Sequence, residues 1–551
     1  MKSCSEIFSR ALGLPVLCLA LGSTQAAAVS SGTVSTIVGV NAGLCMGVEN
    51  SSNTHGAILQ SQTCTGSNYQ KWQITKDSAN YAEIKNVGSG QCMDVSGWSS
   101  DEGTVLQQWD CTGADNQKWN ISDQGNGKYA IISKFSDMAA DVFELRKTSG
   151  TKIIQWPWNG LDNQKWTFPD ATTASNGAMG FAAGVTGGQG GSVVTVTTPS
   201  QLKQYISDDT PRIIRVSGII DFRNTEGSTT ELGCTYSDNY CSNNGKREKI
   251  LNHGGYCSGR STYNITYDTA GATPLQVGSN KTLIGIGANS GIKGKGLRMS
   301  GGVSNIIIRN LSITDINDGT IWAGDALTMV GVSNIWIDHN YVARIGRQLI
   351  VTGWDSVQNL TISNNYLDGT SEYGHYCNNR HYWNELLVAE NQTISFISNR
   401  VSMTSGRAPR FSKNSSASSA GVLHMVNNYF DHNYGTSFVG DNTGTVLMEG
   451  NYYEAADGYS IPIDSNSTGM PLFAPLDSSV GSTDSTCQSV LGRKCAANYA
   501  VDATGNFVTN SSAMSAIQQN SSWRNAIKSV TPKSYSEVKA QSFGPQSDIT
   551  E

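Results

Sequence analysis

Three evenly spaced copies of the tripeptide Gln-Lys-Trp constrain the fold of this chain more than any other feature of its sequence. They occupy Gln70–Trp72, Gln117–Trp119 and Gln164–Trp166, and both intervals are 47 residues. A fixed period of this length marks a repeated structural unit that buries its apolar face only when it stacks on its neighbours. Residues 32–168 are therefore predicted to form three related β units, with the three tryptophans in a shared core.

Cysteines recur in the same register. Cys45 and Cys64 of the first unit align with Cys92 and Cys111 of the second, which predicts one disulfide within each of these two units. The third unit has no cysteine at the matching positions.

The Gln-x-Trp triplets resemble those of the ricin-B-type β-trefoil, the carbohydrate-binding module of family 13. This resemblance implies that a unit can hold a sugar with an acid, an aromatic ring and an amide, because a carboxylate accepts bonds from two hydroxyls and an aromatic face covers the C–H side of a pyranose. The matching positions in the second and third units are Asp94, Trp109, Asn116, Asp141, Trp156 and Asn163. The first unit has Gly47, Gln62 and Tyr69 there, so we expect it not to bind sugar.

The N-terminus is typical of a secretory signal peptide, residues 1–28. Lys2 and Arg10 precede the apolar run 11–21, and small alanines follow at 26–28. The alternative is a buried or membrane helix, but this run is shorter than the ~20 residues that span a bilayer. We expect a secreted, extracellular protein that is not held in a membrane.

The predicted secretion favours disulfide bonds between the remaining cysteines. Ten remain after residue 28, and an even number in an oxidising compartment predicts five disulfides. A zinc site is the alternative, but the sequence lacks the paired C-x-x-C spacing that would support it. Asn264, Asn280, Asn391 and Asn510 lie in sequons that would allow N-glycosylation in a eukaryotic host.

Composition agrees with an extracellular, turn-rich β protein. The 551 residues include 59 glycines, only 15% are charged, and the formal net charge is -6. Electrostatic binding of nucleic acid needs a basic face, so we expect no nucleic-acid partner. We expect a monomer.

A Gly-rich, small-residue linker at 169–178 is predicted to lead into a second domain at 179–530. Here short alternating strands recur, and five of them open with Asn280, Asn305, Asn334, Asn359 and Asn391, at intervals of 25, 29, 25 and 32 residues. Alternation predicts strands, and asparagine tolerates left-handed turns. One strand per turn with asparagine at equivalent corners indicates a right-handed parallel β-helix. A β-sandwich is the alternative, but it does not call for such a corner. The whole chain is thus predicted to be all-β, a trefoil followed by a β-helix.

Motifs of this second domain resemble the pectin lyases of polysaccharide lyase family one, most closely the fungal type. They are GFAAGVTGG, SNKTLIGIG, GIKGKGLR, IWAGDAL, WIDHNYVARIGRQ, SNNYLDG, CNNRHYW and SGRAPR, spread over about 180–500. The resemblance implies cleavage of methyl-esterified pectin by β-elimination, without a cofactor. The variable intervals between the repeated strands indicate loops inserted on one face of the β-helix, where solenoids usually place function.

Catalytic roles carry over residue by residue. The resemblance implies that Arg407 of SGRAP abstracts the C5 proton of a galacturonate residue, and that Asp325 of WAGDA lies in the cleft. Arg347 of IGRQ occupies the area where pectate lyases hold calcium with carboxylates. The family often has Lys where this chain has Arg410, so the positive charge is kept and the donor geometry differs. A guanidinium has a pKa above ~12, so the role of Arg407 requires surroundings that lower this value.

Aromatic side chains are expected to line the cleft, because aromatic walls suit a methylated polymer. Trp322, Trp383, Tyr256 and Tyr236 are the candidates. His339 is interpreted as structural rather than as a general base.

The resemblance also implies three disulfides in the second domain, Cys234–Cys257, Cys241–Cys377 and Cys487–Cys495. The first two would rigidify the rim of the cleft. Two other functions stay open at this point. A calcium-dependent pectate lyase would need a carboxylate cluster in the cleft, where Arg347 falls instead, so calcium is not expected. A non-catalytic glycan-binding adhesin would be favoured by loss of Arg407 or Asp325, and both are present.

Overall fold

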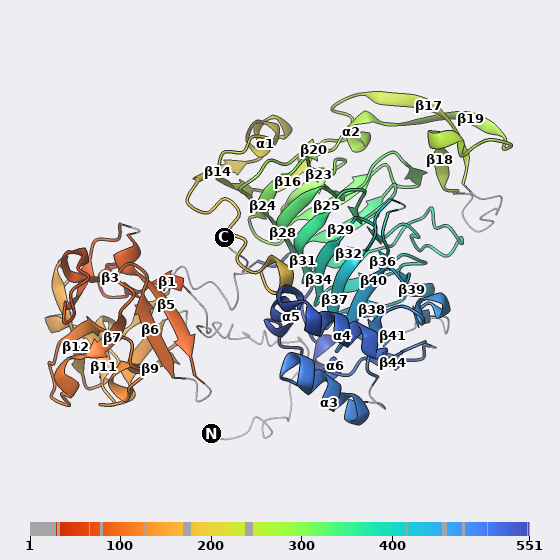
Figure 1. Ribbon diagram of the computed structural model, residues 1–551. Helices are drawn as coiled ribbons and strands as arrows, with labels where there is room; N and C mark the ends of the chain where they lie inside the picture. The colour runs from red at the N-terminus through yellow and green to blue at the C-terminus, as the bar shows by residue number, and fades with distance from the viewer. Residues whose placement is uncertain are drawn as a thin grey trace, which may run out of the picture. The chain divides into compact units, whose positions relative to one another are not determined.

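The computed structural model describes residues 29, 34–65, 67–77, 81–125, 128–168, 178–236, 246–414, 416–454, 460–476, 480–503, 505–547 and 549. The predicted signal peptide, nearly all of the predicted linker and Cys241 lie outside the described residues. The chain divides into two compact units, Met1–Ser175 and Asn176–Glu551, and each is described by itself (Figure 1).

The first unit is a β-trefoil built from antiparallel strand pairs. Its strands are β1 (Val34–Thr36), β2 (Val38–Gly39), β3 (Cys45–Val48), β4 (Leu59–Gln62), β5 (Lys71–Lys76), β6 (Ala82–Asn86), β7 (Cys92–Val95), β8 (Leu106–Trp109), β9 (Lys118–Asp123), β10 (Tyr129–Ser133), β11 (Ala139–Val142), β12 (Thr151–Trp156) and β13 (Trp166–Thr167).

The three repeated tryptophans form the centre of the trefoil, as predicted. Trp72, Trp119 and Trp166 are fully buried in one apolar cluster. Each indole N–H donates to a backbone carbonyl at an equivalent place, at 2.9 to 3.1 Å. A buried indole that keeps its hydrogen bond pays no penalty for an unpaired polar group, so the repeat fixes both packing and register.

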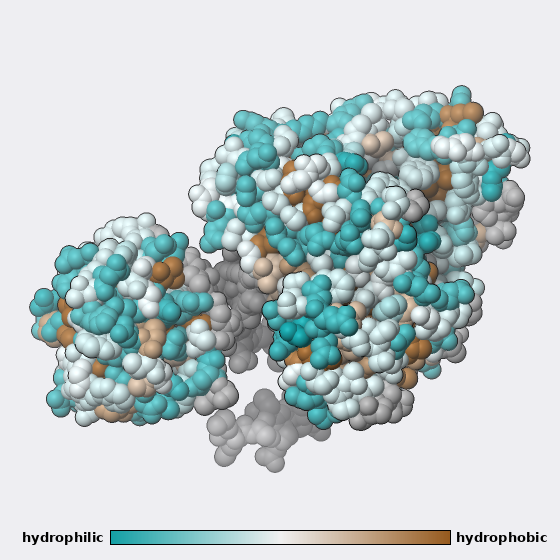
Figure 2. Space-filling view, viewed as in Figure 1, coloured by the Kyte–Doolittle hydropathy of each residue, from teal (hydrophilic) through white to brown (hydrophobic). Residues whose placement is uncertain are grey.

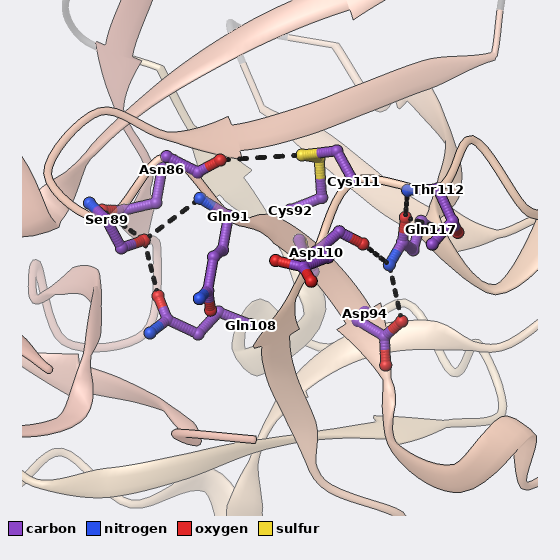
Figure 3. Close-up of a disulfide and its surroundings, with 12 residues drawn as sticks. Asn86, Ser89, Gln91, Cys92, Asp94, Gln108, Asp110, Cys111, Thr112 and Gln117 are labelled. Carbon is purple, nitrogen blue, oxygen red and sulfur yellow. Dashed lines mark hydrogen bonds between the residues drawn. A yellow bond between two sulfur atoms is a disulfide. The ribbon is translucent and has the colours of Figure 1, made fainter. Parts of the chain in front are cut away.

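The predicted trefoil disulfides, Cys45–Cys64 and Cys92–Cys111, are present. Figure 3 shows the second of them beside Gln117, whose amide nitrogen donates to Asp94 at 2.9 Å and to the Asp110 carbonyl at 2.8 Å. The glutamine of the repeated tripeptide therefore links the core to the predicted sugar site.

The second unit is a parallel β-helix in which successive coils contribute strands to three parallel sheets of ten, nine and eight strands. The ten-stranded sheet contains β14 (Ser192–Val196), β15 (Arg212–Val216), β21 (Lys281–Gly285), β24 (Ser304–Arg309), β28 (Val332–Asp338), β31 (Val357–Ser363), β34 (Gln392–Ile397), β37 (Gly421–Val426), β40 (Gly444–Glu449) and β43 (Leu472–Phe473). The nine-stranded sheet contains β16 (Ile219–Asp221), β22 (Gly291–Lys293), β25 (Ser312–Ile316), β29 (Tyr341–Ile345), β32 (Tyr366–Asp368), β35 (Arg400–Ser402), β38 (Tyr429–Asp431), β41 (Tyr452–Glu454) and β44 (Tyr499–Val501).

The third sheet, here called the groove sheet, has eight strands. They are β20 (Leu275–Gln276), β23 (Leu297–Ser300), β27 (Leu327–Val330), β30 (Ile350–Thr352), β33 (Glu385–Leu387), β36 (Arg410–Phe411), β39 (Gly435–Gly440) and β42 (Ser460–Ile463). Its inward-facing side chains, such as Leu297, Leu327 and Ile350, join the main apolar cluster. Their sequence neighbours point outward, because side chains alternate along a strand.

Asparagines stabilise the corners between sheets. The five predicted corner residues, Asn280 to Asn391, all have positive φ, between 46 and 60°. A second, buried ladder connects side-chain amides on successive coils through hydrogen bonds of 2.8 to 3.1 Å; its members are Asn340, Asn365, Asn399, Asn428, Asn451 and Asn498. Each amide satisfies its neighbour, so these polar groups are buried without an unpaired donor.

Helices and an inserted sheet surround the β-helix. They are α1 (Pro199–Ile206), α2 (Thr269–Ala272), α3 (Val480–Leu491), α4 (Ser511–Gln519), α5 (Ser521–Lys528) and α6 (Tyr535–Val538). Figure 1 shows α1 at the end where the β-helix begins and α3 at the other end. The inserted four-stranded sheet comprises β17 (Ser228–Thr235), β18 (Lys249–Leu251), β19 (Thr262–Asp268) and β26 (Thr320–Ile321).

Two of the disulfides implied for this unit, Cys234–Cys257 and Cys487–Cys495, are present. Cys377 is disulfide-bonded, and its expected partner Cys241 lies outside the described residues.

The visible face of each unit is mostly hydrophilic, with small, separate hydrophobic patches (Figure 2). Among the described helices, none has the length and apolar character needed to cross a bilayer.

Candidate active site

A groove crosses the outer face of the groove sheet, and Arg407 lies in its middle. Two adjoining cavities, of about 310 and 520 Å³, share Arg407 as a lining residue. The first extends over β23, β27, β30 and β33 and is lined by Arg298, Trp322, Asp325, Arg347, Trp354 and Trp383 among others. The second is lined by tyrosines, Arg410 and Asp464. The groove therefore runs across the strands.

Arg407 lies in the loop between β35 and β36, in a left-handed conformation with φ of 49°. The loop is held by the backbone, since the Glu385 N–H donates to the Arg407 carbonyl at 2.7 Å. The guanidinium packs on Trp383, with 4.5 Å between its carbon and the ring centre. With the Gln348 amide turned to satisfy its neighbours, Gln348 accepts a bond from Arg407 Nη1 at 3.0 Å. Within the described residues, the buried Nε atom has no hydrogen-bond partner.

These surroundings weaken the basic character of Arg407. Burial lowers the pKa of its guanidinium below the ordinary value, and the charge of Arg410 acts in the same direction. The phenols of Tyr382 and Tyr236 oppose this shift. A guanidinium stacked on an indole, without a carboxylate partner and beside a second cation, releases its proton more easily than a free arginine.

Asp325 and Arg347 form a pair beside Arg407. Arg347 Nε and Nη2 donate to the two carboxylate oxygens at 2.8 and 2.5 Å, and the Gln348 N–H donates to the same carboxylate at 2.9 Å. The Arg347 guanidinium also covers the ring of Trp322 at 3.9 Å. His381 bonds the backbone carbonyl of Arg347 through Nε2 at 2.6 Å. The pair thus presents a fixed cation and an exposed indole to the groove.

The inserted sheet places Trp322 and Trp383. Ile250 of β18 pairs in parallel with Ile321 of β26, directly before Trp322, which is 41% exposed. Trp383 is almost buried and donates from its indole nitrogen to Glu248 at 3.2 Å.

The other two predicted aromatic residues belong to a supporting cluster rather than to the lining of the two cavities. Tyr236 and Tyr256 stack on one another with 5.6 Å between ring centres, and Tyr236 contacts Trp383 edge-on at 5.2 Å. Neither tyrosine is among the described residues that line these two cavities. His339 bonds Asp338 at 2.6 Å, away from the groove lining, in agreement with a structural role.

Several groove residues were not singled out from the sequence, among them Arg298, Gln348, Trp354, Tyr382 and Asp464. Arg298 alternates with the inward-facing Leu297 and Met299 of β23, so the alternation of the strand was a usable signal for it. Trp354 is 65% exposed in a loop, where no periodicity could indicate that it borders the groove.

Both predicted sugar sites of the trefoil have the same layout. Asp94 accepts from Gln107 at 2.9 Å and from Asn116 at 2.8 Å, and Asp141 accepts from Asn163 at 2.8 Å. The indoles at the matching aromatic positions, Trp109 and Trp156, are about two-fifths exposed, at 41 and 39%.

Burial acts on both carboxylates. It raises the pKa of Asp141 to about 6, against hydrogen bonds from Gln164 and Asn163. It also raises the pKa of Asp94, against three amide donors rather than two. In the first unit the matching place is filled, because a Cβ added at Gly47 would lie 2.5 Å from Gln62 Oε1.

The pectate lyase family matches residues 235–541. The chain belongs to the pectate lyase family. The ricin-type β-trefoil lectin domain family matches the N-terminal unit twice, over residues 25–109 and 68–156.

Similar proteins include fungal pectin lyases. A probable pectin lyase D of Aspergillus niger is 39% identical over 352 residues, covering 62% of this chain and 87% of the relative. A probable pectin lyase D of Aspergillus flavus is 40% identical over 336 residues, covering 59% and 83%. A solved variant of Bacillus subtilis pectate lyase aligns with 68% of this chain and 98% of its own, at 18% identity and a TM-score of 0.40.

Proposed function

We propose that this chain is a secreted pectin lyase that cleaves methyl-esterified polygalacturonan by β-elimination. The observation that carries the proposal is Arg407, a half-buried guanidinium with a lowered pKa, which lies between two cations in the middle of an aromatic groove. Similarity to fungal pectin lyases over more than four-fifths of their length supports the same substrate.

In the proposed reaction, neutral Arg407 takes the proton from C5 of a galacturonate ester. The C–H electron pair forms the C4=C5 double bond, the C4–O4 bond breaks, and the departing O4 receives a proton from solvent. Negative charge develops on the acyl oxygen during proton removal. Arg347, fixed by Asp325, and Arg410, next on the groove sheet, supply positive charge there. A methyl ester carries no charge of its own, so it lowers the cost of this step.

Two features favour a reaction without calcium. Calcium takes 6–8 oxygen ligands, largely from carboxylates. Among the described residues that line the groove, Asp325 and Asp464 are the acids, and both oxygens of Asp325 already bind Arg347. The groove therefore suits an esterified substrate whose charge is balanced by arginines.

The trefoil is proposed to bind neutral or acidic sugars of the plant cell wall through the sites at Asp94 and Asp141. Its exposed Trp109 and Trp156 support this role, because each can cover one face of a pyranose. The first unit has Gly47 where the other two have the acid, and Gln62 fills the space beside it, so this unit does not bind sugar.

Substitution of Arg407 tests the catalytic assignment. The variant Arg407→Ala should lose at least about a thousandfold in kcat on methylated pectin, the magnitude typical of removing a general base together with its charge. The variant Arg524→Ala removes an arginine of helix α5, outside the lining of the two cavities, and serves as the control, with turnover close to wild type. Near-normal turnover of the Arg407 variant would remove it from the mechanism.

A further inference from the structure

One column of outward-facing residues runs across the groove sheet, one residue per strand. Parallel pairing aligns Arg298 of β23 with Thr328 of β27, then Val351 of β30, Leu386 of β33 and Arg410 of β36. Val439 of β39 follows Arg410, and Asp464 lies directly after β42, where its N–H donates to the Phe438 carbonyl at 3.0 Å. All seven residues line the two cavities of the groove.

Charge is distributed unevenly along this column. Arg298 is four strands from Arg410, or ~19 Å at the usual strand spacing, and Asp464 is two strands away on the other side, or ~10 Å. Between the two arginines the floor of the groove is neutral, formed by Thr328, Val351 and Leu386. A cation thus marks one end of the groove and an anion the other.

The Arg298 charge is available to a ligand. Within the described part of the chain its guanidinium makes no ion pair or hydrogen bond, whereas Arg347 is engaged by Asp325. At the other end, Asp464 accepts the Asn466 N–H at 2.8 Å and has no cationic partner among the described residues. A partly buried guanidinium with five free donors is a ready site for a carboxylate.

We propose that Arg298 forms a subsite for the free carboxylate of an unesterified galacturonate residue, and that Asp464 excludes such a residue from the opposite end. This inference rests on the proposed pectin lyase function and deepens it. A pyranose residue spans about one strand spacing, and the Arg407 guanidinium contacts Gln348 and Trp383, which lie just before β30 and β33, so the free acid would lie roughly two to three sugars from the cleaved bond. The enzyme would then cut preferentially at a set distance from free acids in partly esterified pectin.

Two polymers test the proposal, fully methyl-esterified polygalacturonan and the same polymer partly saponified with alkali. The measured quantity is the ratio of kcat/KM on the saponified to that on the esterified polymer. An exposed charge pair contributes up to ~1 kcal/mol, so Arg298→Gln should lower this ratio about fivefold and Arg298→Lys by less. The variant Asp464→Asn should raise it. The control Arg524→Gln, with the same change of net charge in α5, should leave it unchanged.

Product analysis gives the sharper readout. Mass spectrometry of wild-type products should show free acids enriched at one distance from the unsaturated end, and Arg298→Gln should lose this enrichment. Raised salt should weaken the preference, because exposed charges are screened. An unchanged ratio and an unchanged product pattern in Arg298→Gln would overturn the proposal.

Failure of the proposed function would be recognised separately, as wild-type protein inactive on both polymers. Binding then decides the matter. The affinity of partly saponified oligogalacturonate is measured by calorimetry in the Arg407→Ala background, with and without Arg298→Gln. A loss of about fivefold in affinity supports the carboxylate subsite, and equal affinities refute it.

Discussion

The pair of Asp325 and Arg347 offers the most detailed prediction. Asp325→Asn keeps one acceptor oxygen toward Arg347 Nε but places an amide N–H₂ against Nη2, where a carboxylate oxygen accepts a bond of 2.5 Å. The substitution removes one of the two fork bonds and the negative charge. The Gln348 N–H also loses a charged acceptor at 2.9 Å.

The magnitude follows from these contacts. A hydrogen bond to a charged group contributes ~1.5–3 kcal/mol, and the side chains of Arg347 and Asp325 are only 17 and 12% exposed, so solvent screens the pair little. We expect the free energy of unfolding to fall by about 2 kcal/mol. Arg347 would also lose its fixed place over Trp322, and misplacing a group that acts on the transition state should lower kcat/KM on methylated pectin by about 10- to 100-fold.

A matched control exists on another face of the β-helix. Asp315 holds Arg344 in the same fork, with bonds of 2.5 and 3.2 Å, on strands of the nine-stranded sheet. Asp315→Asn should cost some stability and leave kcat/KM within about twofold of wild type. The assays are denaturant unfolding and initial rates on methylated pectin. A folded Asp325→Asn protein with kcat/KM as close to wild type as the control would refute the role of this pair.

Three further predictions concern charge and cross-linking. Neutral Arg407 is the reactive form, so kcat/KM should rise with pH. The variant Arg410→Gln removes a charge that lowers the pKa of Arg407, so it should move this rise to higher pH, whereas Arg410→Lys should move it little. The measurement is the pH–rate profile of each variant. Sugar binding at the Asp141 site needs the ionised carboxylate, whose pKa is about 6. In an Asp94→Ala background, which leaves this site alone, glycan retention should be full near pH ~7.5 and fall below pH ~6. Retention that stays constant down to pH ~5 would contradict this. Replacing both cysteines of Cys92–Cys111, which are 19 residues apart, by serine should lower the unfolding free energy of the trefoil by ~3 kcal/mol, and an unchanged melting temperature would argue against it.

Local repetition explains why much of the fold could be predicted from the sequence. The tripeptide ending in Trp72, Trp119 and Trp166 repeats a complete structural unit, so register alone located the trefoil core. The corner asparagines could also be predicted from the sequence, because few residue types other than glycine and asparagine adopt a positive φ. The buried ladder from Asn340 to Asn498 was not predicted as a ladder, since its contacts join residues 23 to 47 positions apart.

The residues of the candidate site could be predicted from the sequence only where they lie in motifs of the family. Arg407, Arg347, Asp325 and Trp322 come together at the groove as the motifs implied. Tyr236 packs against Trp383 and stacks on Tyr256, and neither tyrosine lines the two described cavities, because the inserted loop folds into a sheet of its own. Such long-range placement of loops depends on tertiary packing, which no local sequence pattern encodes.

We propose that the chain cleaves methylated pectin by β-elimination, with an arginine base and without calcium. The direct test incubates the protein with highly methylated pectin and EDTA and follows the absorbance of the 4,5-unsaturated product. Product should accumulate at a rate unaffected by the chelator, and Arg407→Ala should form none. Activity confined to polygalacturonate with added calcium would contradict it in favour of a pectate lyase, and absence of product from both polymers would indicate a glycan-binding protein without catalysis.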